Sequence, residues 1–456
     1  MRDIVKSILR FLGFDRALTF GILARVWGLF SGPITMFVIA TGFSPPQQGF
    51  YFTFSSLLAL QIFFDLGLMF VIAQFASHEF VNLSWGPNGS LDGEPAALRR
   101  FIDLLCKTSL WFGVAALLMM AVLIPTGLIF FAGKGNVDFS WRLPWVLAVI
   151  GTSFNLFVMP FFAIIMGSGD VVTVNKRELV AALLSSLLCW GVIGFHGGLY
   201  AAFAVNIGAL AISWGYLMTR RPELVKMALK GWFRGARPAG KAPGGLSWWH
   251  EIWPMQWRMA VSSGAAYFIF QLFNPVLFNY HGPIVAGQMG MTLTAANALL
   301  AGGMTVLNAK TPEFGKLIAV RDWEGLDRLF FRVTRHALLL VLVGALVGFI
   351  AIWQLQVHLA IGRRFIPAGH AALLLGTVCF QTAAGAFAIY LRAHKKEPLM
   401  RMTIIASLLQ GAGTWYLGKH FASLGVTAGF FSVTTFFVFP YVLFVWRRCR
   451  QEWHAC

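Results

Sequence analysis

The sequence predicts an all-α membrane protein of about twelve transmembrane helices, arranged as two pseudo-symmetric six-helix bundles around a central cleft. Composition is the first reason: of 456 residues, 58% are hydrophobic and 12% are charged. Soluble domains carry about 25% charged residues, so this chain has too few to cover a water-facing surface. Many apolar runs exceed the ~18 residues that cross a bilayer. Lipid satisfies no backbone hydrogen bonds, so these runs are expected to be helical.

Twelve apolar segments are expected to span the membrane, with short turns between several of them. The first set lies at 17–41, 47–75, 104–131, 143–167, 178–195 and 197–219. The second set lies at 254–280, 284–309, 336–357, 366–391, 401–419 and 423–446.

The distribution of Lys and Arg predicts the orientation. If the N-terminus is cytoplasmic, 30 of the 36 Lys and Arg residues fall on the cytoplasmic face, five fall on the other face, and Arg25 lies inside a span. This asymmetry predicts a multi-pass protein of the bacterial inner membrane with both termini cytoplasmic. The net charge of +18 is then a topology signal that also attracts anionic membrane lipids, and nucleic acid is not an expected partner.

Segments outside the spans complete the predicted organisation. Residues 1–16 are basic and amphipathic and are expected to form a retained cytoplasmic segment. Two six-helix bundles, 17–219 and 254–446, are expected to flank a basic, Gly- and Pro-rich cytoplasmic linker at 220–253. Residues 447–456 are expected to form a cytoplasmic tail.

Weak internal repeats suggest that the two halves are related. Pro45-x3-Gly49 follows the first span, and Pro283-x3-Gly287 follows the seventh. The first and seventh spans each contain an interior proline, Pro33 and Pro275. Proline removes a helical hydrogen bond and kinks a helix, so each residue marks either a static packing kink or a hinge. Six spans per half make the repeats parallel, as in transporters that open alternately to either face.

The sequence contains no motif for catalysis or for a cofactor. The five cysteines have no metal-ligand spacing, and the ten histidines are scattered. There is no phosphate-binding loop of the GxxxxGK[ST] kind. The chain is therefore expected to be a transporter rather than an enzyme, without metal or cofactor, and its energy is expected to come from an ion, the membrane potential or the solute gradient.

Two ionisable residues lie deep within neighbouring spans. Arg25 is about 12 Å, and Asp65 about 15 Å, from the cytoplasmic ends of their spans. A charge at mid-span costs about 2.5–3.5 kcal/mol on insertion scales, so it normally faces a partner or a cavity. The two residues are expected either to form a structural ion pair or to serve transport. In the second interpretation Arg25 binds an anionic substrate and Asp65 binds a coupling proton or sodium ion.

Two further cations are candidate substrate contacts. Arg258 lies one turn inside the seventh span, and Lys310 lies at the end of the eighth. Each either extends to the lipid headgroups or adds to a positive surface shared with Arg25.

Several motifs resemble those of a known group of transporters. Residues 65–68 (Asp-Leu-Gly-Leu) and 73–76 (Ala-Gln-Phe-Ala) resemble the second-span signature of polysaccharide-type flippases, within the multidrug/oligosaccharidyl-lipid/polysaccharide exporter (MOP) superfamily. Residues 310–317 (Lys-Thr-Pro-Glu-Phe-Gly-Lys-Leu) resemble the matching signature after the eighth span, and residues 390–395 resemble the usual end of the tenth. At Gln74 the sequence departs from the basic residue that many relatives carry.

The resemblance implies a flippase for a lipid-linked oligosaccharide. Such O-antigen or exopolysaccharide flippases move a polyprenyl-pyrophosphate-linked glycan from the cytoplasmic to the periplasmic leaflet by alternating access, for polysaccharide biosynthesis. A drug/cation antiporter of the same superfamily is the first alternative, although it would be expected to have more acidic residues in its spans. A membrane-embedded glycan polymerase or transferase would need a large outer loop, and a structural scaffold would not require a duplicated design.

Overall fold

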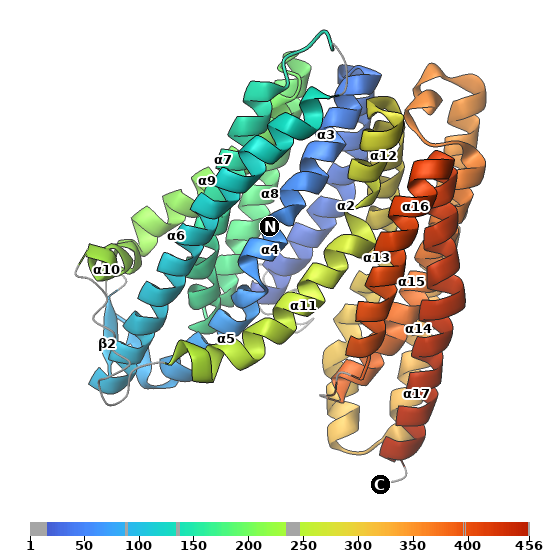
Figure 1. The fold of residues 1–456 in the computed structure, drawn as a ribbon. Coiled ribbons are helices and arrows are strands. Elements are labelled where there is room, and N and C mark those ends of the chain that lie inside the picture. The colour runs from blue at the N-terminus through green and yellow to red at the C-terminus, as the bar shows by residue number, and fades with distance from the viewer. Residues whose placement is uncertain are drawn as a thin grey trace, which may run out of the picture. The chain divides into compact units, whose positions relative to one another are not determined.

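The computed structural model describes residues 16–86, 90–133, 137–233, 247–394, 396 and 398–454, and these residues are nearly all helical (Figure 1). The predicted segment 1–16 lies outside them, apart from Arg16 at the start of the first helix. Contacts divide the chain into two units. Unit 1 contains Met1–Ser31 and Leu57–Gly264, and unit 2 contains Gly32–Ser56 and Ala265–Cys456.

Three helices pass from one unit to the other. They are α2 (Arg16–Gly42), α3 (Pro45–Leu58) and α11 (Trp253–Phe270). This division differs from the predicted one, because residues 32–56 lie with the second half of the chain and the first part of α11 lies with the first half.

The remaining helices of unit 1 form a bundle in which α6 packs on α7, α7 packs on α9, and α8 packs on α9. A short hairpin precedes α6, with Leu83 paired to Gly93 in an antiparallel register. The elements are η1 (Ala59–Gln61), α4 (Ile62–Asp65), α5 (Leu68–Glu79), η2 (Phe80–Asn82), β1 (Leu83–Trp85), β2 (Leu91–Gly93), α6 (Pro95–Ala132), α7 (Arg142–Gly167), α8 (Val171–Gly194), α9 (Tyr200–Arg220), α10 (Pro222–Phe233) and the π-helical turn η5 (Trp248–Ile252).

Unit 2 repeats part of this packing: α14 packs on α15, and α15 packs on α17. A π-helical segment, η7, joins α16 to α17. The elements are α12 (Phe273–His281), α13 (Pro283–Ala319), α14 (Trp323–His358), η6 (Ala360–Arg364), α15 (Ala368–Ala393), α16 (Met400–Ser432), η7 (Val433–Val438) and α17 (Phe439–His454).

The helices agree with the predicted spans. Among the described residues, nine helices are long and apolar enough to cross a membrane, or up to 11 if each bent pair is one span. The longest, Met400–His454, is interrupted by non-helical backbone at Phe421 and Ala422. This interruption separates the two spans that the sequence predicts at 401–419 and 423–446.

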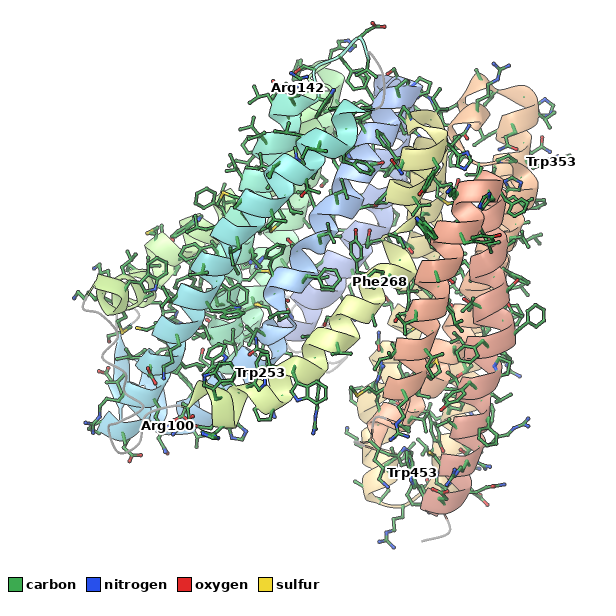
Figure 2. All side chains as sticks on the ribbon, in the orientation of Figure 1. Arg100, Arg142, Trp253, Phe268, Trp353 and Trp453 are labelled. Carbon is green, nitrogen blue, oxygen red and sulfur yellow. The ribbon has the colours of Figure 1, made fainter. Side chains whose placement is uncertain are left out.

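Large apolar side chains cover the outward faces of the helices. Trp353 on α14, labelled in Figure 2, is 49% exposed, and Leu346 and Val347 on the same helix are 58% and 61% exposed. Such exposure would be unfavourable in water and is the arrangement that a lipid-facing surface requires.

Two segments outside the predicted spans are more ordered than expected. The predicted flexible linker begins with α10, because Leu224, Val225 and Ala228 recur at helical spacing and are buried. Residues 234–246 of that linker lie outside the described residues. The predicted tail after 446 continues α17 to His454, and Cys449 is buried on its inner face.

Candidate functional site

Asp65 lies where the second span breaks. It ends α4, and the next two residues, Leu66 and Gly67, have left-handed backbone with φ values of 52° and 66°. Glycine tolerates this conformation at little cost, whereas leucine does not, so the break is built into the chain. The two parts of the span, Pro45–Asp65 and Leu68–Asn82, are bent by 42°. A break of this kind exposes backbone groups that a continuous helix would satisfy internally.

The break lies against α11 within unit 1. A Cβ on Gly67 would lie 2.8 Å from Cβ of Met259, and a Cβ on Gly264 would lie 3.0 Å from the ring of Phe63. Only glycine permits this close approach, so these contacts hold Asp65 beside α11.

The Asp65 carboxylate uses only part of its hydrogen-bonding capacity. The backbone N–H of Met69 donates to it. Its Oδ1 atom is buried and has no hydrogen-bond partner among the described residues. A buried carboxylate oxygen without a partner is costly unless a proton or a cation joins it.

Arg25 and Asp65 do not form the ion pair that was one interpretation of the sequence. Arg25 is exposed on α2, and no ion pair joins it to Asp65 among the described residues. The helix contacts α8 through Trp27 instead, whose indole Nε1 donates to Oγ of Ser186 at 3.1 Å. A substrate-binding role for Arg25 remains a prediction.

The other two predicted cations lie in different surroundings. Arg258 is exposed on α11 in unit 1, with its guanidinium 5.8 Å from the ring centroid of Trp257. Lys310 is on α13 in unit 2 and forms an ion pair with Glu313 at 2.6 Å, one turn along the same helix. Both remain candidate substrate contacts, although Glu313 already neutralises Lys310.

The two predicted hinge prolines differ. α2 continues as a helix through Pro33, which lies two residues beyond the passage from unit 1 to unit 2 at Ser31. Pro275 follows a break between α11 and α12, where the chain bends by 43°. Because Pro275 has no N–H, the carbonyl of Gln271 loses its helical partner at this break.

Unit 2 contains an apolar cavity of about 250 Å³. Phe270 and Phe430 line it, together with the amide side chains of Gln381 and Gln410. Oε1 of Gln410 is buried and has no hydrogen-bond partner among the described residues. The π-helical segment η7 forms part of the wall, and such segments are frequent at functional sites. The cavity combines an apolar lining with a few polar groups, as small-molecule sites do.

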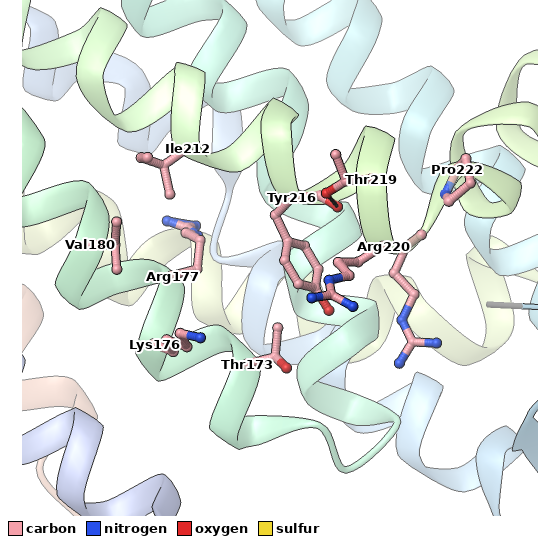
Figure 3. A pocket seen from close by; sticks show the side chains of 10 residues that line it. Thr173, Lys176, Arg177, Val180, Ile212, Tyr216, Thr219, Arg220 and Pro222 are labelled. Carbon is pink, nitrogen blue, oxygen red and sulfur yellow. Dashed lines mark hydrogen bonds between the residues drawn. The ribbon is translucent and has the colours of Figure 1, made fainter. Parts of the chain in front are cut away.

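A second cavity, of about 790 Å³, lies in unit 1 between the first turns of α8 and the end of α9. Four cations line it, Lys176 and Arg177 from α8 and Arg220 and Arg221 from the end of α9 (Figure 3). We call it the basic pocket. The sequence analysis did not identify this pocket. The two dibasic pairs, Lys176-Arg177 and Arg220-Arg221, lie at the adjoining ends of neighbouring antiparallel spans and could have indicated it.

Comparison with solved structures shows which known fold this architecture shares. A variant of the MATE transporter VcmN from Vibrio cholerae is 12% identical, with a TM-score of 0.56, over 97% of this chain and 98% of that chain. The MATE multidrug transporter DinF-BH is 14% identical with a TM-score of 0.56 over 95% of both chains. A MOP superfamily transporter from Pyrococcus furiosus, described as having a binding pocket of reversed polarity, is 11% identical with a TM-score of 0.52 over 95% of both chains. The chain has the MATE fold.

This MATE fold confirms the predicted all-α class with two helical bundles. No family model matches the chain, and no curated protein matches it. At 11–14% identity the likeness concerns the fold alone. The solute and the coupling ion must therefore be argued from the residues of this chain.

Proposed function

We propose that the protein is an alternating-access membrane transporter that exports an amphipathic organic solute, with Asp65 carrying the coupling proton or sodium ion. The MATE fold over nearly the whole chain is the observation that carries this proposal. No residue constellation in the sequence favours catalysis instead. The orientation from Lys and Arg places both termini in the cytoplasm, which we retain as part of the proposal.

The three passages between the units support movement of one unit against the other. The first lies at Ser31, beside Pro33, and the second lies at Ser56, just before the 3-10 turn η1. The third lies at Gly264, in the helix that breaks before Pro275. Each passage lies near a proline, a 3-10 turn or a helix break, where few residues need to change conformation, so these regions are suitable hinges.

Asp65 has the properties that ion coupling needs. Its Oδ1 atom is buried and has no hydrogen-bond partner among the described residues, and the residue ends a helix at a break. Binding of a proton or a sodium ion there would neutralise a charge that is otherwise costly in the membrane. A ligand shifts the equilibrium between two conformations only if it binds one of them more tightly. The affinity of Asp65 for the ion would differ between the two conformations if the contacts of Gly67 and Met259 at the break change during transport.

The apolar cavity of unit 2 supports a solute with an apolar body. Phe270, Phe430 and Met304 present aromatic and flexible apolar surface, and Gln381 and Gln410 offer hydrogen bonds to a polar group. This lining favours the drug-antiporter alternative over a purely ionic solute.

Transport by the purified protein in sealed vesicles tests the proposal. We expect an imposed pH or sodium gradient to drive movement of a fluorescent rhodamine dye, which has a flat apolar body and one cationic group. Gln410→Ala should raise the dye concentration needed for half-maximal transport, while Gln47→Ala, at the partly exposed start of α3, should not. Absence of gradient-driven movement of any amphipathic probe by correctly folded protein would contradict the proposal.

A lipid-linked oligosaccharide flippase is the second candidate. The excess of cations over acids favours it, because a pyrophosphate group needs cationic partners and Arg25 is exposed and unpaired among the described residues. It predicts that Arg25→Ala abolishes movement of a fluorescent polyprenyl-pyrophosphate glycan across vesicles. If the protein moves the rhodamine dye and leaves that lipid in place, the flippase candidate is wrong and the first candidate stands.

A further inference from the structure

The basic pocket is built from several separate elements of unit 1. Asp170 caps the start of α8 by accepting a hydrogen bond from the backbone N–H of Thr173 at 3.3 Å. Lys176 and Arg177 follow within the next two turns, and Arg220 ends α9. Pro222 then begins α10 and fixes the direction of the chain after Arg221. The pocket is therefore a product of the α7–α8 turn and the α9–α10 junction, and it does not involve Asp65 or the cavity of unit 2.

Two of its arginines are held in place by aromatic rings. The guanidinium of Arg177 lies 4.2 Å from the ring centroid of Phe162, and that of Arg221 lies 3.9 Å from the centroid of Trp85. Trp85 is fixed in turn, since its Nε1 donates to Oγ of Ser168 at 3.0 Å. Stacking of this kind orients the planar donor groups before any ligand arrives.

The positive charge of the pocket is only partly neutralised. Arg221 forms an ion pair with Asp170 at 3.4 Å. Among the described residues Lys176, Arg177 and Arg220 have no ion pair, and Glu178, which follows Arg177, is exposed. Nε of Arg177 and Nε of Arg221 are both buried without a hydrogen-bond partner in the described part of the chain. Buried guanidinium donors without acceptors are costly, so a ligand with several anionic oxygens would stabilise this arrangement.

The walls of the pocket suggest the kind of ligand. Hydroxyl groups of Thr173, Tyr216 and Thr219 lie near the cations, and Val180 and Ile212 form an apolar side farther along α8 and α9 (Figure 3). Val180 is 36% exposed, as expected for a residue at a lipid-facing edge. A polar, cationic end with an apolar side along two spans matches a molecule whose phosphate group lies at the interface and whose chains enter the hydrocarbon.

We propose that the basic pocket binds the phosphate headgroup of an anionic phospholipid from the leaflet at the α8 N-terminus and the α9 C-terminus, with Lys176, Arg177 and Arg220 as its principal contacts. The orientation from Lys and Arg makes this the cytoplasmic leaflet. A free phosphate would share the cationic contacts and make no use of Val180 and Ile212. The lipid is the occupant that accounts for both ends of the pocket.

Binding of defined lipids to the full-length protein in detergent tests this proposal. Phosphatidylglycerol and phosphatidylcholine would be titrated separately, with inorganic phosphate as a third ligand, and bound lipid would be counted by native mass spectrometry. The test variant is Lys176→Gln with Arg220→Gln, because both side chains are exposed and their loss should leave the fold intact. The matched control is Lys226→Gln on α10, an exposed lysine already paired with Glu223.

We expect phosphatidylglycerol to bind more tightly than phosphatidylcholine, and the double variant to weaken that binding by about ten- to thirty-fold. The control should change it by less than about two-fold. Equal binding of the two lipids, or unchanged binding in the double variant, would overturn the proposal. So would displacement of phosphatidylglycerol by millimolar inorganic phosphate, which would identify a free-phosphate site. Because no transport is measured, failure of this test leaves the proposed function untouched, and the reverse also holds.

Discussion

Gly49 on α3 and Gly287 on α13 lie directly against each other in unit 2, such that a Cβ on Gly287 would be 2.8 Å from the backbone nitrogen of Gly49. The neighbouring Gln48 strengthens this contact, since its Nε2 donates to the carbonyl of Gly287 at 2.8 Å. The two glycines occupy the same place in the two Pro-x3-Gly motifs of the sequence. The repeated motif therefore marks a close contact between the two halves of the chain, at the ends of the spans that the proposed orientation assigns to the outer face.

Gly49→Ala should lower the stability of the protein. The new methyl group would overlap the carbonyl of Pro283, which is backbone and cannot move aside as a side chain can. We expect a loss of about 1–3 kcal/mol, typical of overpacking, measured as a lower midpoint of thermal unfolding in detergent. Gly413→Ala is the control, because a Cβ there meets nothing within 4 Å. An equal effect of the two substitutions would show that the contact does not constrain the helices.

Asp65→Asn should uncouple transport from the ion gradient. The amide keeps the size of the side chain and cannot exchange a proton, so solute movement down its own gradient should persist while gradient-driven accumulation falls at least about ten-fold. Accumulation of the rhodamine dye with and without an imposed gradient measures this. Asp138→Asn, at an exposed position before α7, is the control. If the Asp65 variant still accumulates solute normally, the coupling role is wrong.

Asp327→Asn should loosen the ends of three helices of unit 2. Oδ1 of Asp327 on α14 accepts a hydrogen bond from the hydroxyl of Tyr390 on α15 at 2.9 Å, and Oδ2 accepts one from Nε of Arg450 on α17 at 3.0 Å. Loss of the charge leaves a partly exposed arginine without its partner, which should cost about 1–2 kcal/mol.

The control for that substitution is Glu452→Gln. Arg448 and Glu452 form an ion pair at 2.8 Å whose side chains are 70% and 52% exposed. Exposed pairs contribute little, so the control should change stability much less than Asp327→Asn does. A larger loss in the control than in Asp327→Asn would contradict the assignment of Asp327 as the residue that joins these helices.

His394, just beyond α15, should make unit 2 less stable at acidic pH. Burial lowers the pKa of His394 below its ordinary value, and Lys396 acts in the same direction, while the carbonyl of Tyr390 and the charge of Asp327 oppose them. The unfolded chain then binds a proton at His394 more readily than the folded one. The contribution of neutral His394 to stability is therefore fully present above about pH 6.5 and is lost as the pH decreases toward the lower pKa of the folded state.

Thermal unfolding midpoints between about pH 7.5 and pH 5 check this expectation. His394→Gln removes the titrating group and should flatten the pH dependence, whereas His78→Gln, exposed on α5, should leave it unchanged. The same slope in wild type and in His394→Gln would mean that other groups cause the acid sensitivity.

Local patterns in the sequence were sufficient to predict where the long helices lie. Span positions depend on runs of apolar residues that must be helical in lipid, so α7 at Arg142–Gly167 and α15 at Ala368–Ala393 differ from the predicted 143–167 and 366–391 by only a few residues. The positions of the helix breaks could not be predicted in this way, because Pro33 and Pro275 have similar sequence surroundings. Only packing decides that α2 continues through one and that α11 ends before the other.

The sequence by itself determined the approximate positions of the spans and the repeated Pro-x3-Gly motifs, since hydropathy and helix geometry act over neighbouring residues. Only the tertiary structure decided which charges meet. It separated Arg25 from Asp65, paired Lys310 with Glu313, and gathered Arg177, Arg220 and Arg221 around one pocket. The reason is physical: a side chain's depth in the membrane follows from its place in a span, whereas the direction it faces follows from the rotation of that helix against its neighbours, which no local pattern fixes.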